Sequence, residues 1–190
     1  MTPRLAAAID IGGTHTKVGL VDDTGSILAR GKVETPPRGD PDRLVDGIAA
    51  ALQPVLGTHE VAGIGVSVAG SLTASRDAMV GNANLPALCD YPLKRALEER
   101  LGRNCKLEVD SNASAIAEYR YGAGRDATRL LSIVIGTGVG GGVIVGGRLL
   151  RYTGECAGDL GHVIVSPTGR RCTCGATGCL EAMICSDAVA

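Results

Sequence analysis

Apolar stretches of strand length alternate with amphipathic stretches of helix length, and this alternation restricts the fold more than any other feature of the chain. Residues 4–11, 16–22 and 26–34 predict three strands in hairpin succession. The later predicted elements are a helix beginning at Asp40 or Pro41, a strand at 61–69, a helix at 91–102, a strand at 105–109 and a helix at 111–121. The order βββαβαβα predicts an α/β domain.

A second series of strands follows a glycine-containing break at residues 122–126. Residues 129–135 predict a strand, and residues 142–151 predict a hairpin. We therefore expect an N-terminal domain at residues 1–124 and the start of a second α/β domain at residues 125–190. A chain of 190 residues is long enough for one large domain or two small ones.

Composition excludes several classes of function. The chain carries 19 Lys plus Arg against 20 Asp plus Glu, so it has no basic excess for a nucleic-acid backbone. Aromatic residues make up only 2% of the chain, which excludes an aromatic platform for stacking bases and predicts an aliphatic core. No apolar run approaches the length of a membrane span, and the N-terminus makes a poor signal peptide. We expect no membrane partner and a cytoplasmic location.

Two glycine-rich loops lie between predicted strands. In the first, Asp10-Ile-Gly-Gly-Thr14, Gly12 and Gly13 would let backbone N–H groups approach an anion, and Asp10 could hold Mg²⁺ through water. The second, residues 136–142, has five glycines in seven positions. A plain glycine turn is the alternative for each loop. The pair favours one nucleotide phosphate chain held from two domains, although neither loop has a Walker or dinucleotide-binding spacing.

A carboxylate follows the predicted strand at 105–109. Asp110 could cap the next helix, since Asp is a common N-cap residue. It could also accept the proton of a sugar hydroxyl that attacks a γ-phosphate, because ligands of α/β proteins bind at strand ends. The residue types alone leave both interpretations open.

The seven cysteines are an odd number, which argues against a framework built only from disulfides. Cys172, Cys174 and Cys179 form a Cys₃His set with His162, a set that suits a structural Zn²⁺. Free buried cysteines are the alternative. The isolated cysteines are expected to be small core residues: Cys89, Cys105, Cys156 and Cys185.

Taken together, these motifs resemble the ROK family of bacterial sugar kinases and related sugar-responsive repressors. The matches run in family order: DIGGTHTK (10–17), NLP (84–86), EVDSNASA (108–115), GTGVGGG (136–142), GDLGH (158–162) and CTCGATGCLE (172–181). The resemblance implies an actin-like, hexokinase-like ATPase fold. It also implies ATP, Mg²⁺ and a structural Zn²⁺ as cofactors, a hexose as substrate and a homodimer when full length.

The resemblance also implies roles for individual residues. Asp110 matches the catalytic base. The first phosphate loop corresponds to Asp10, Gly12, Gly13 and Thr14, and the second to Gly136, Thr137, Gly138 and Gly140. The sugar contacts correspond to Asn84, Asp110, Asp159, His162 and Glu181, with Gly70 lining the pocket. The zinc ligands correspond to His162, Cys172, Cys174 and Cys179.

Three departures from the family pattern qualify these roles. Asp159 replaces the usual Glu, and Val109 replaces the Asn that commonly precedes the catalytic Asp. Whole family enzymes also continue well beyond the zinc motif, so the chain resembles a truncated form with an incomplete second domain. We expect truncation to leave the apolar strand at 129–135 bare.

The leading interpretation is an ATP-dependent hexose kinase that phosphorylates glucose or a related hexose at the 6-hydroxyl. The alternatives are a sugar-sensing protein of the repressor branch that binds without turnover, and an inactive fragment. The repressors carry an N-terminal helix-turn-helix, for which the chain has no room before the loop at Asp10. We therefore expect no nucleic-acid partner.

Overall fold

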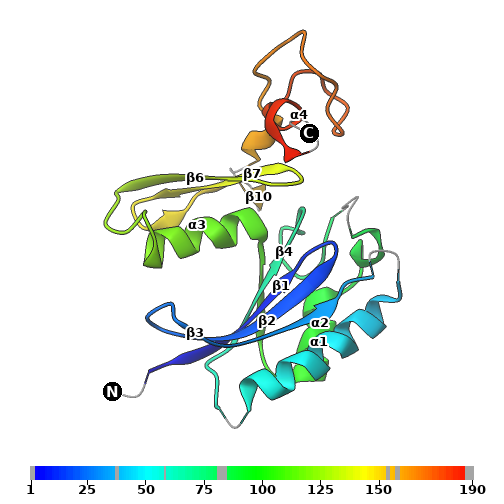
Figure 1. The fold of residues 1–190 in the computed structure, drawn as a ribbon, viewed down its shortest axis with the longest axis vertical. Helices are drawn as coiled ribbons and strands as arrows, with labels where there is room; N and C mark the ends of the chain where they lie inside the picture. The colour runs from blue at the N-terminus through cyan, green and yellow to red at the C-terminus, as the bar shows by residue number, and fades with distance from the viewer. Residues whose placement is uncertain are drawn as a thin grey trace. The chain divides into compact units, whose positions relative to one another are not determined.

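The computed structural model describes residues 3–36, 39–57, 59–80, 85–152, 155–156 and 159–186. It divides into two compact units, residues 1–110 and residues 111–190 (Figure 1). Each unit has its own sheet, and each is described by itself. Among the described residues, no helix is both long enough and apolar enough to cross a lipid bilayer.

The first unit is built on a five-stranded sheet in the order β3-β2-β1-β4-β5. The strands are β1 (Leu5–Ile11), β2 (His15–Asp22), β3 (Ile27–Glu34), β4 (Ile64–Val68) and β5 (Cys105–Val109). The first three strands are antiparallel neighbours, as expected for successive hairpins. β4 and β5 are parallel to β1, because a helix-containing connection precedes each of them.

Helices α1 (Pro41–Leu56) and α2 (Leu93–Leu101) cover one face of this sheet (Figure 1). Asp40 caps α1 by accepting a hydrogen bond from the Asp42 amide, and Pro41 occupies the first turn, where its missing N–H costs nothing. α2 ends at Gly102, whose left-handed backbone (φ 62°) suits glycine. The buried side chains of α1 recur at helical spacing: Leu44, Val45, Ile48, Leu52 and Val55.

The core of the first unit is aliphatic, as the composition predicts. It is lined by Ile, Leu, Val and Ala side chains from the sheet and both helices, joined by Met79 and Cys105. Cys105 is buried as expected for a core cysteine, and burial raises the pKa of its thiol to about 11. Cys89 and Cys185 are only partly buried, and the side chain of Cys156 lies outside the described residues.

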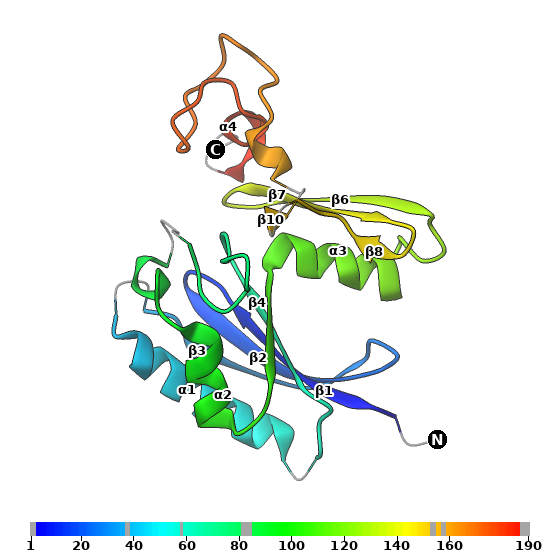
Figure 2. The same cartoon turned by 180° about the vertical axis from the view of Figure 1, so that it is seen from behind.

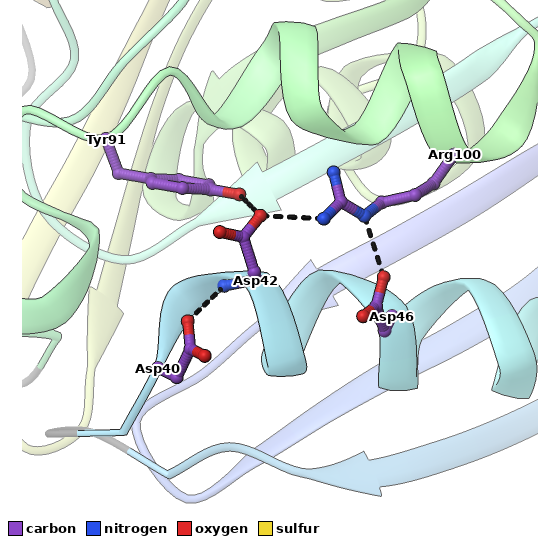
Figure 3. A network of polar contacts seen from close by, with 5 residues as sticks. All are labelled: Asp40, Asp42, Asp46, Tyr91 and Arg100. Atoms are coloured by element: carbon purple, nitrogen blue, oxygen red, sulfur yellow. Dashed lines mark hydrogen bonds and ion pairs between the residues drawn. The ribbon is translucent and has the colours of Figure 1, made fainter.

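A polar network joins α1 to α2 on the surface (Figure 3). The Tyr91 hydroxyl donates to Asp42 Oδ1 over 2.8 Å, and Arg100 Nη2 donates to the same oxygen over 2.7 Å. Arg100 Nε also donates to Asp46 Oδ1 over 2.7 Å. One guanidinium therefore bridges two carboxylates that lie one helical turn apart on α1.

The second unit contains α3 (Asp110–Tyr121) and an antiparallel sheet of β6 (Arg129–Ile135), β7 (Val139–Val145) and β8 (Arg148–Leu149). Two shorter strands, β9 (Arg151–Tyr152) and β10 (Glu155–Cys156), pair with each other. The 3₁₀ helices η1 (Pro86–Leu88), in the first unit, and η2 (Leu160–His162), in the second, and the short helix α4 (Leu180–Ile184) complete the elements. Figure 2 shows α4 beside the loop that leads to it.

The division between the units falls after residue 110, before the body of α3, whereas the sequence places the boundary after residue 124. The reason is the packing of α3 against β7. A Cβ added at Gly142 would lie 2.5 Å from the Ala115 Cβ, and one added at Gly140 would lie 2.8 Å from the Ser111 Cβ. The two glycines let the sheet approach the helix closely, so α3 belongs with the second sheet.

One face of β6 is apolar and exposed. Leu131, Ile133 and Ile135 are 55%, 48% and 58% exposed, and they alternate along the strand and therefore share a face. Val145, opposite Arg129 on β7, lies on the same face and is 45% exposed. The expectation that residues 129–135 would be bare therefore agrees with the structure.

Candidate functional site

Three strands of the first unit end side by side, and their ends carry the residues predicted to bind ligand. In the parallel register Ile11 lies opposite Val68, and Val68 lies opposite Val109. The residues that follow these three positions are therefore neighbours at one edge of the sheet. This is the edge where α/β folds bind ligands, because helix and loop backbone groups converge there.

The first predicted phosphate loop follows β1 at this edge. The Gly12 amide donates to the His15 carbonyl over 3.2 Å, which closes a tight turn between β1 and β2. A Cβ added at Gly12 would lie 3.0 Å from that carbonyl oxygen, so a larger residue would push the turn open. Gly13 is half-buried in the turn and Thr14 is exposed, so the Thr14 hydroxyl is available to a ligand.

Asp10 is anchored by the strands on either side of it. Its Oδ1 accepts a hydrogen bond from Ser67 Oγ over 3.0 Å, and its Oδ2 lies 3.6 Å from Lys17 Nζ. The register explains both contacts, since Asp10 pairs with Ser67 on β4 and with Lys17 on β2. The side chain remains 49% exposed, which fits a carboxylate that would hold a hydrated Mg²⁺.

Gly70 and Asp110 occupy the other two strand ends. Gly70 follows β4 with φ at 99°, a conformation that an L-residue rarely adopts. Asp110 follows β5 directly and is exposed in the first turn of α3. It therefore stands both at a helix start and at the ligand-binding edge of the sheet. Asn84, the remaining sugar contact expected in this unit, lies outside the described residues.

The second predicted phosphate loop includes the turn that joins β6 to β7. The Gly136 amide donates to the Gly138 carbonyl over 2.9 Å, so the loop turns back on itself within three residues. Gly136 and Thr137 are exposed, and a Cβ added at Gly136 would meet nothing within 4 Å. Gly140 lies in β7, where it faces Ser111 of α3.

The Cys₃His set predicted from the sequence is assembled in the second unit. One ligand atom from each of His162, Cys172, Cys174 and Cys179 lies within 4.8 Å of all the others. Cys172 Sγ is 3.6 Å from His162 Nδ1, and Cys174 Sγ is 3.7 Å from Cys179 Sγ. A tetrahedral zinc with bonds of about 2.3 Å to sulfur and about 2.0–2.1 Å to nitrogen separates its ligand atoms by roughly 3.5–3.8 Å. The donor set and its spacing therefore fit Zn²⁺.

Backbone pairing within residues 163–180 shapes the metal set. Ile164 pairs with Cys179, and Arg171 pairs with Thr177, so the segment forms a compact double turn. Gly178 has φ at 81°, and a Cβ there would collide with the Ser166 carbonyl. Desolvation by burial raises the pKa of the Cys179 thiol to about 12, whereas a hydrogen bond from the Ala176 backbone lowers the pKa of Cys174.

The two ring nitrogens of His162 face different groups. One faces the cysteines of the predicted metal set, and the other faces a carboxylate. Its Nδ1 is directed to Cys172, while its Nε2 lies 3.8 Å from Asp159 Oδ1. With a metal at Nδ1, the proton of the ring belongs to Nε2, where it can be donated to a carboxylate or a sugar hydroxyl. Asp159, which stands where the family usually has the longer Glu, thus lies beside Nε2 of His162.

Glu181 opens α4 and contacts two other parts of the second unit. Its Oε2 accepts a hydrogen bond from the Val139 amide over 2.9 Å, and Cys172 Sγ lies 3.7 Å from its Oε1. Sequence reasoning assigned Glu181 only to sugar and missed its contact with β7. It also missed Ser67 and Lys17 beside Asp10, because no local motif records which residues become partners across strands.

The chain matches known proteins over almost its whole length. The model of the ROK family matches residues 6–190. A glucokinase of Streptomyces coelicolor is 37% identical over 177 residues, which is 93% of this chain and 55% of that protein. An N-acetylmannosamine kinase of Escherichia coli is 37% identical over 186 residues, which is 96% of this chain and 62% of that protein.

A solved structure shares the fold. The crystal structure of a ROK family glucokinase from Streptomyces griseus, in complex with glucose and AMPPNP, superposes with a TM-score of 0.85 at 38% identity. The match covers 97% of this chain and 58% of that one. The predicted actin-like, hexokinase-like fold is confirmed. The chain spans little more than half the length of these relatives.

Proposed function

The chain belongs to the ROK family, and from that premise we propose that it carries the catalytic core of an ATP-dependent hexose kinase. The reaction would move the γ-phosphoryl group of ATP to the 6-hydroxyl of glucose or a related hexose. The hydroxyl oxygen forms the new bond to phosphorus, the bond from phosphorus to the β–γ bridging oxygen breaks, and ADP leaves.

One observation supports this proposal above the others. The parallel ends of β1, β4 and β5 bring Asp10, Gly70 and Asp110 to one sheet edge. Phosphoryl transfer needs phosphate-binding backbone amides, a metal-holding carboxylate and a base for the attacking hydroxyl. The loop at Gly12 supplies the first, Asp10 the second and Asp110 the third.

The second unit carries the other residues that the family resemblance assigns to phosphate and to sugar. The loop at Gly136–Gly138 offers exposed backbone to phosphate oxygens, in the manner of other glycine-rich anion sites. His162, Asp159 and Glu181 would bind sugar hydroxyls, together with Asn84. The Cys₃His set would hold Zn²⁺, which orders the loop that carries His162 and leaves its Nε2 for the sugar.

The test is a sugar kinase assay on the purified, zinc-loaded protein with ATP and Mg²⁺. The sugars to compare are glucose, mannose, fructose, allose, N-acetylmannosamine and N-acetylglucosamine. We expect a 6-phosphate of at least one of them, with Asp110→Asn as the inactive control. Calorimetry with each sugar runs alongside. Sugar binding without any phosphorylated product would favour a sugar-sensing role and overturn the kinase proposal.

A further inference from the structure

The short helix α4 is bonded to the second phosphate loop at both of its ends. At its start, Glu181 Oε2 accepts a hydrogen bond from the Val139 amide over 2.9 Å, directly after the turn at Gly136–Gly138. Just beyond its end, the Ser186 amide donates to the Gly136 carbonyl over 2.9 Å. Two hydrogen bonds therefore fix the two ends of the segment Gly136–Val139.

The same helix begins on the metal set. Cys179, a predicted zinc ligand, is the N-cap residue of α4. The other oxygen of the same carboxylate, Glu181 Oε1, lies 3.7 Å from Cys172 Sγ, the sulfur of another predicted zinc ligand. A single side chain thus spans the distance from a metal ligand to the first residue of β7.

The close contacts leave little room for the loop to relax independently. A Cβ at Gly138 would lie 2.6 Å from Glu181 Oε2, so the carboxylate packs directly on the loop. Gly161, next to His162, lies so close to Val139 that a Cβ there would collide with the Val139 carbonyl. Movement of the segment that carries the predicted zinc ligands, residues 162–179, would therefore disturb Val139 both through Glu181 and through Gly161.

We propose that Glu181 is a positioning residue for the second phosphate loop, and that through it metal occupancy of the Cys₃His set controls how well the loop binds phosphate. A carboxylate has about four lone-pair positions, so the hydrogen bond from the Val139 amide leaves it able to accept a sugar hydroxyl as well. The inference rests on the proposed function only for the identity of the ligand, a nucleotide phosphate chain.

The direct test is backbone amide exchange at Val139, measured by NMR or mass spectrometry on the zinc-loaded protein. Glu181→Ala removes the acceptor, so exchange at Val139 should become at least about tenfold faster, as expected when a charge-assisted hydrogen bond is lost. Glu181→Gln keeps an acceptor oxygen and should restore most of the protection. Zinc content should stay at one ion per chain in both variants.

A second pair of variants leaves Glu181 intact. Ser186→Pro removes the amide that holds Gly136, while Ser186→Ala keeps it, and the extended backbone of Cys185 (φ −64°, ψ 165°) accepts a following proline. We expect Ser186→Pro to raise the Kd or KM for MgATP about tenfold and to leave the KM for sugar unchanged. Glu181→Ala should raise both the Kd or KM for MgATP and the KM for sugar, whereas Ser186→Ala should change neither.

Metal removal completes the test. In the wild type, chelation should remove most of the protection of the Val139 amide. In Glu181→Ala the further change at that amide should be much smaller, because only the contact with Gly161 remains to transmit it. Loss of zinc from Glu181→Ala, or a Val139 amide that stays protected in that variant or in the chelated wild type, would overturn the inference. The exchange measurement needs no turnover, so the inference and the proposed kinase activity can fail separately.

Discussion

Asp110 is the residue whose two interpretations differ most in consequence. It stands both at the start of α3 and at the edge of the first sheet where we propose that ligand binds. As a base it takes the proton of the attacking hydroxyl, and as a cap it only supports the helix. Substitution by Asn separates the two, because Asn caps helices about as well as Asp but cannot accept a proton at neutral pH.

We predict that Asp110→Asn lowers kcat by about 10²–10⁴-fold and preserves the fold and weak sugar binding. The measurements are steady-state kinetics, sugar calorimetry and thermal unfolding of the variant beside the wild type. If the kcat of Asp110→Asn stayed within a factor of two of the wild-type value, Asp110 would act only as a helix cap and not as the base.

Tyr91 reports on the network that joins α1 to α2 (Figure 3). Burial raises the pKa of Tyr91 to about 12, and its hydrogen bond to the Asp42 carboxylate adds to the shift. The folded state therefore holds the phenol proton in a range where the unfolded chain, with a pKa of about 10, has released it. This contribution to stability is complete below pH 10 and is lost as the pH rises from about 10 to 12.

We predict that the free energy of unfolding of the wild type falls more steeply between pH 10 and 12 than that of Tyr91→Phe. Urea unfolding at several pH values in this range measures the difference, and other titrating groups cancel between the two proteins. Parallel curves for both proteins would show that the phenol does not titrate differently in the folded and unfolded states.

Among the elements, the segment at residues 163–180 carries three of the four predicted zinc ligands and contains two glycines with positive φ. Gly175 and Gly178 both have positive φ, at 96° and 81°. They differ in their surroundings, because a Cβ at Gly175 would meet nothing within 4 Å, whereas one at Gly178 would collide with the Ser166 carbonyl. This pair separates backbone strain from steric exclusion.

We predict that Gly178→Ala loses zinc and unfolds the segment around α4. We expect Gly175→Ala to keep one zinc per chain and to lower the free energy of unfolding by about 1–3 kcal/mol. Elemental analysis and circular dichroism compare the two variants with the wild type. Full zinc content in Gly178→Ala would contradict the idea that the turn at Ser166 shapes the metal set.

For the molecule as a whole, the apolar face of β6 is an exposed surface with a consequence for association. Leu131, Ile133, Ile135 and Val145 are each between 45% and 58% exposed and share one face of the sheet. Contiguous apolar patches of this kind favour association, because burying them removes apolar area from water.

We predict that the 190-residue chain self-associates with increasing concentration, and that Leu131→Thr combined with Ile133→Thr suppresses this. Thr keeps the preference for a strand while removing apolar area. The control is Ile27→Thr, at a site 50% exposed in the first unit, which should leave association unchanged. Light scattering across a concentration series measures the association of the wild type, the double variant and the control. Equal association of the double variant and the control would show that the apolar face of β6 is not the contact surface.

Features encoded within a few neighbouring residues could be predicted from the sequence. The start of α1 at Asp40-Pro41 and the end of α2 at Gly102 follow from capping, which is local. The metal set could be found because its four ligands lie between residues 162 and 179, close enough for one segment to gather them. The strand at 129–135 was predicted with its observed bounds from its mostly apolar composition.

Features that depend on partners far along the chain required the folded structure. The register of β1 with β4 and β2 places Ser67 and Lys17 beside Asp10. That register cannot be predicted from the spacing of these residues in the sequence. The assignment of α3 to the second unit depends on Gly140 and Gly142 admitting the helix against β7. Glu181 reaches Val139 only because the metal-bearing segment folds back onto β7, so its contact arises from packing between segments rather than from the order of residues.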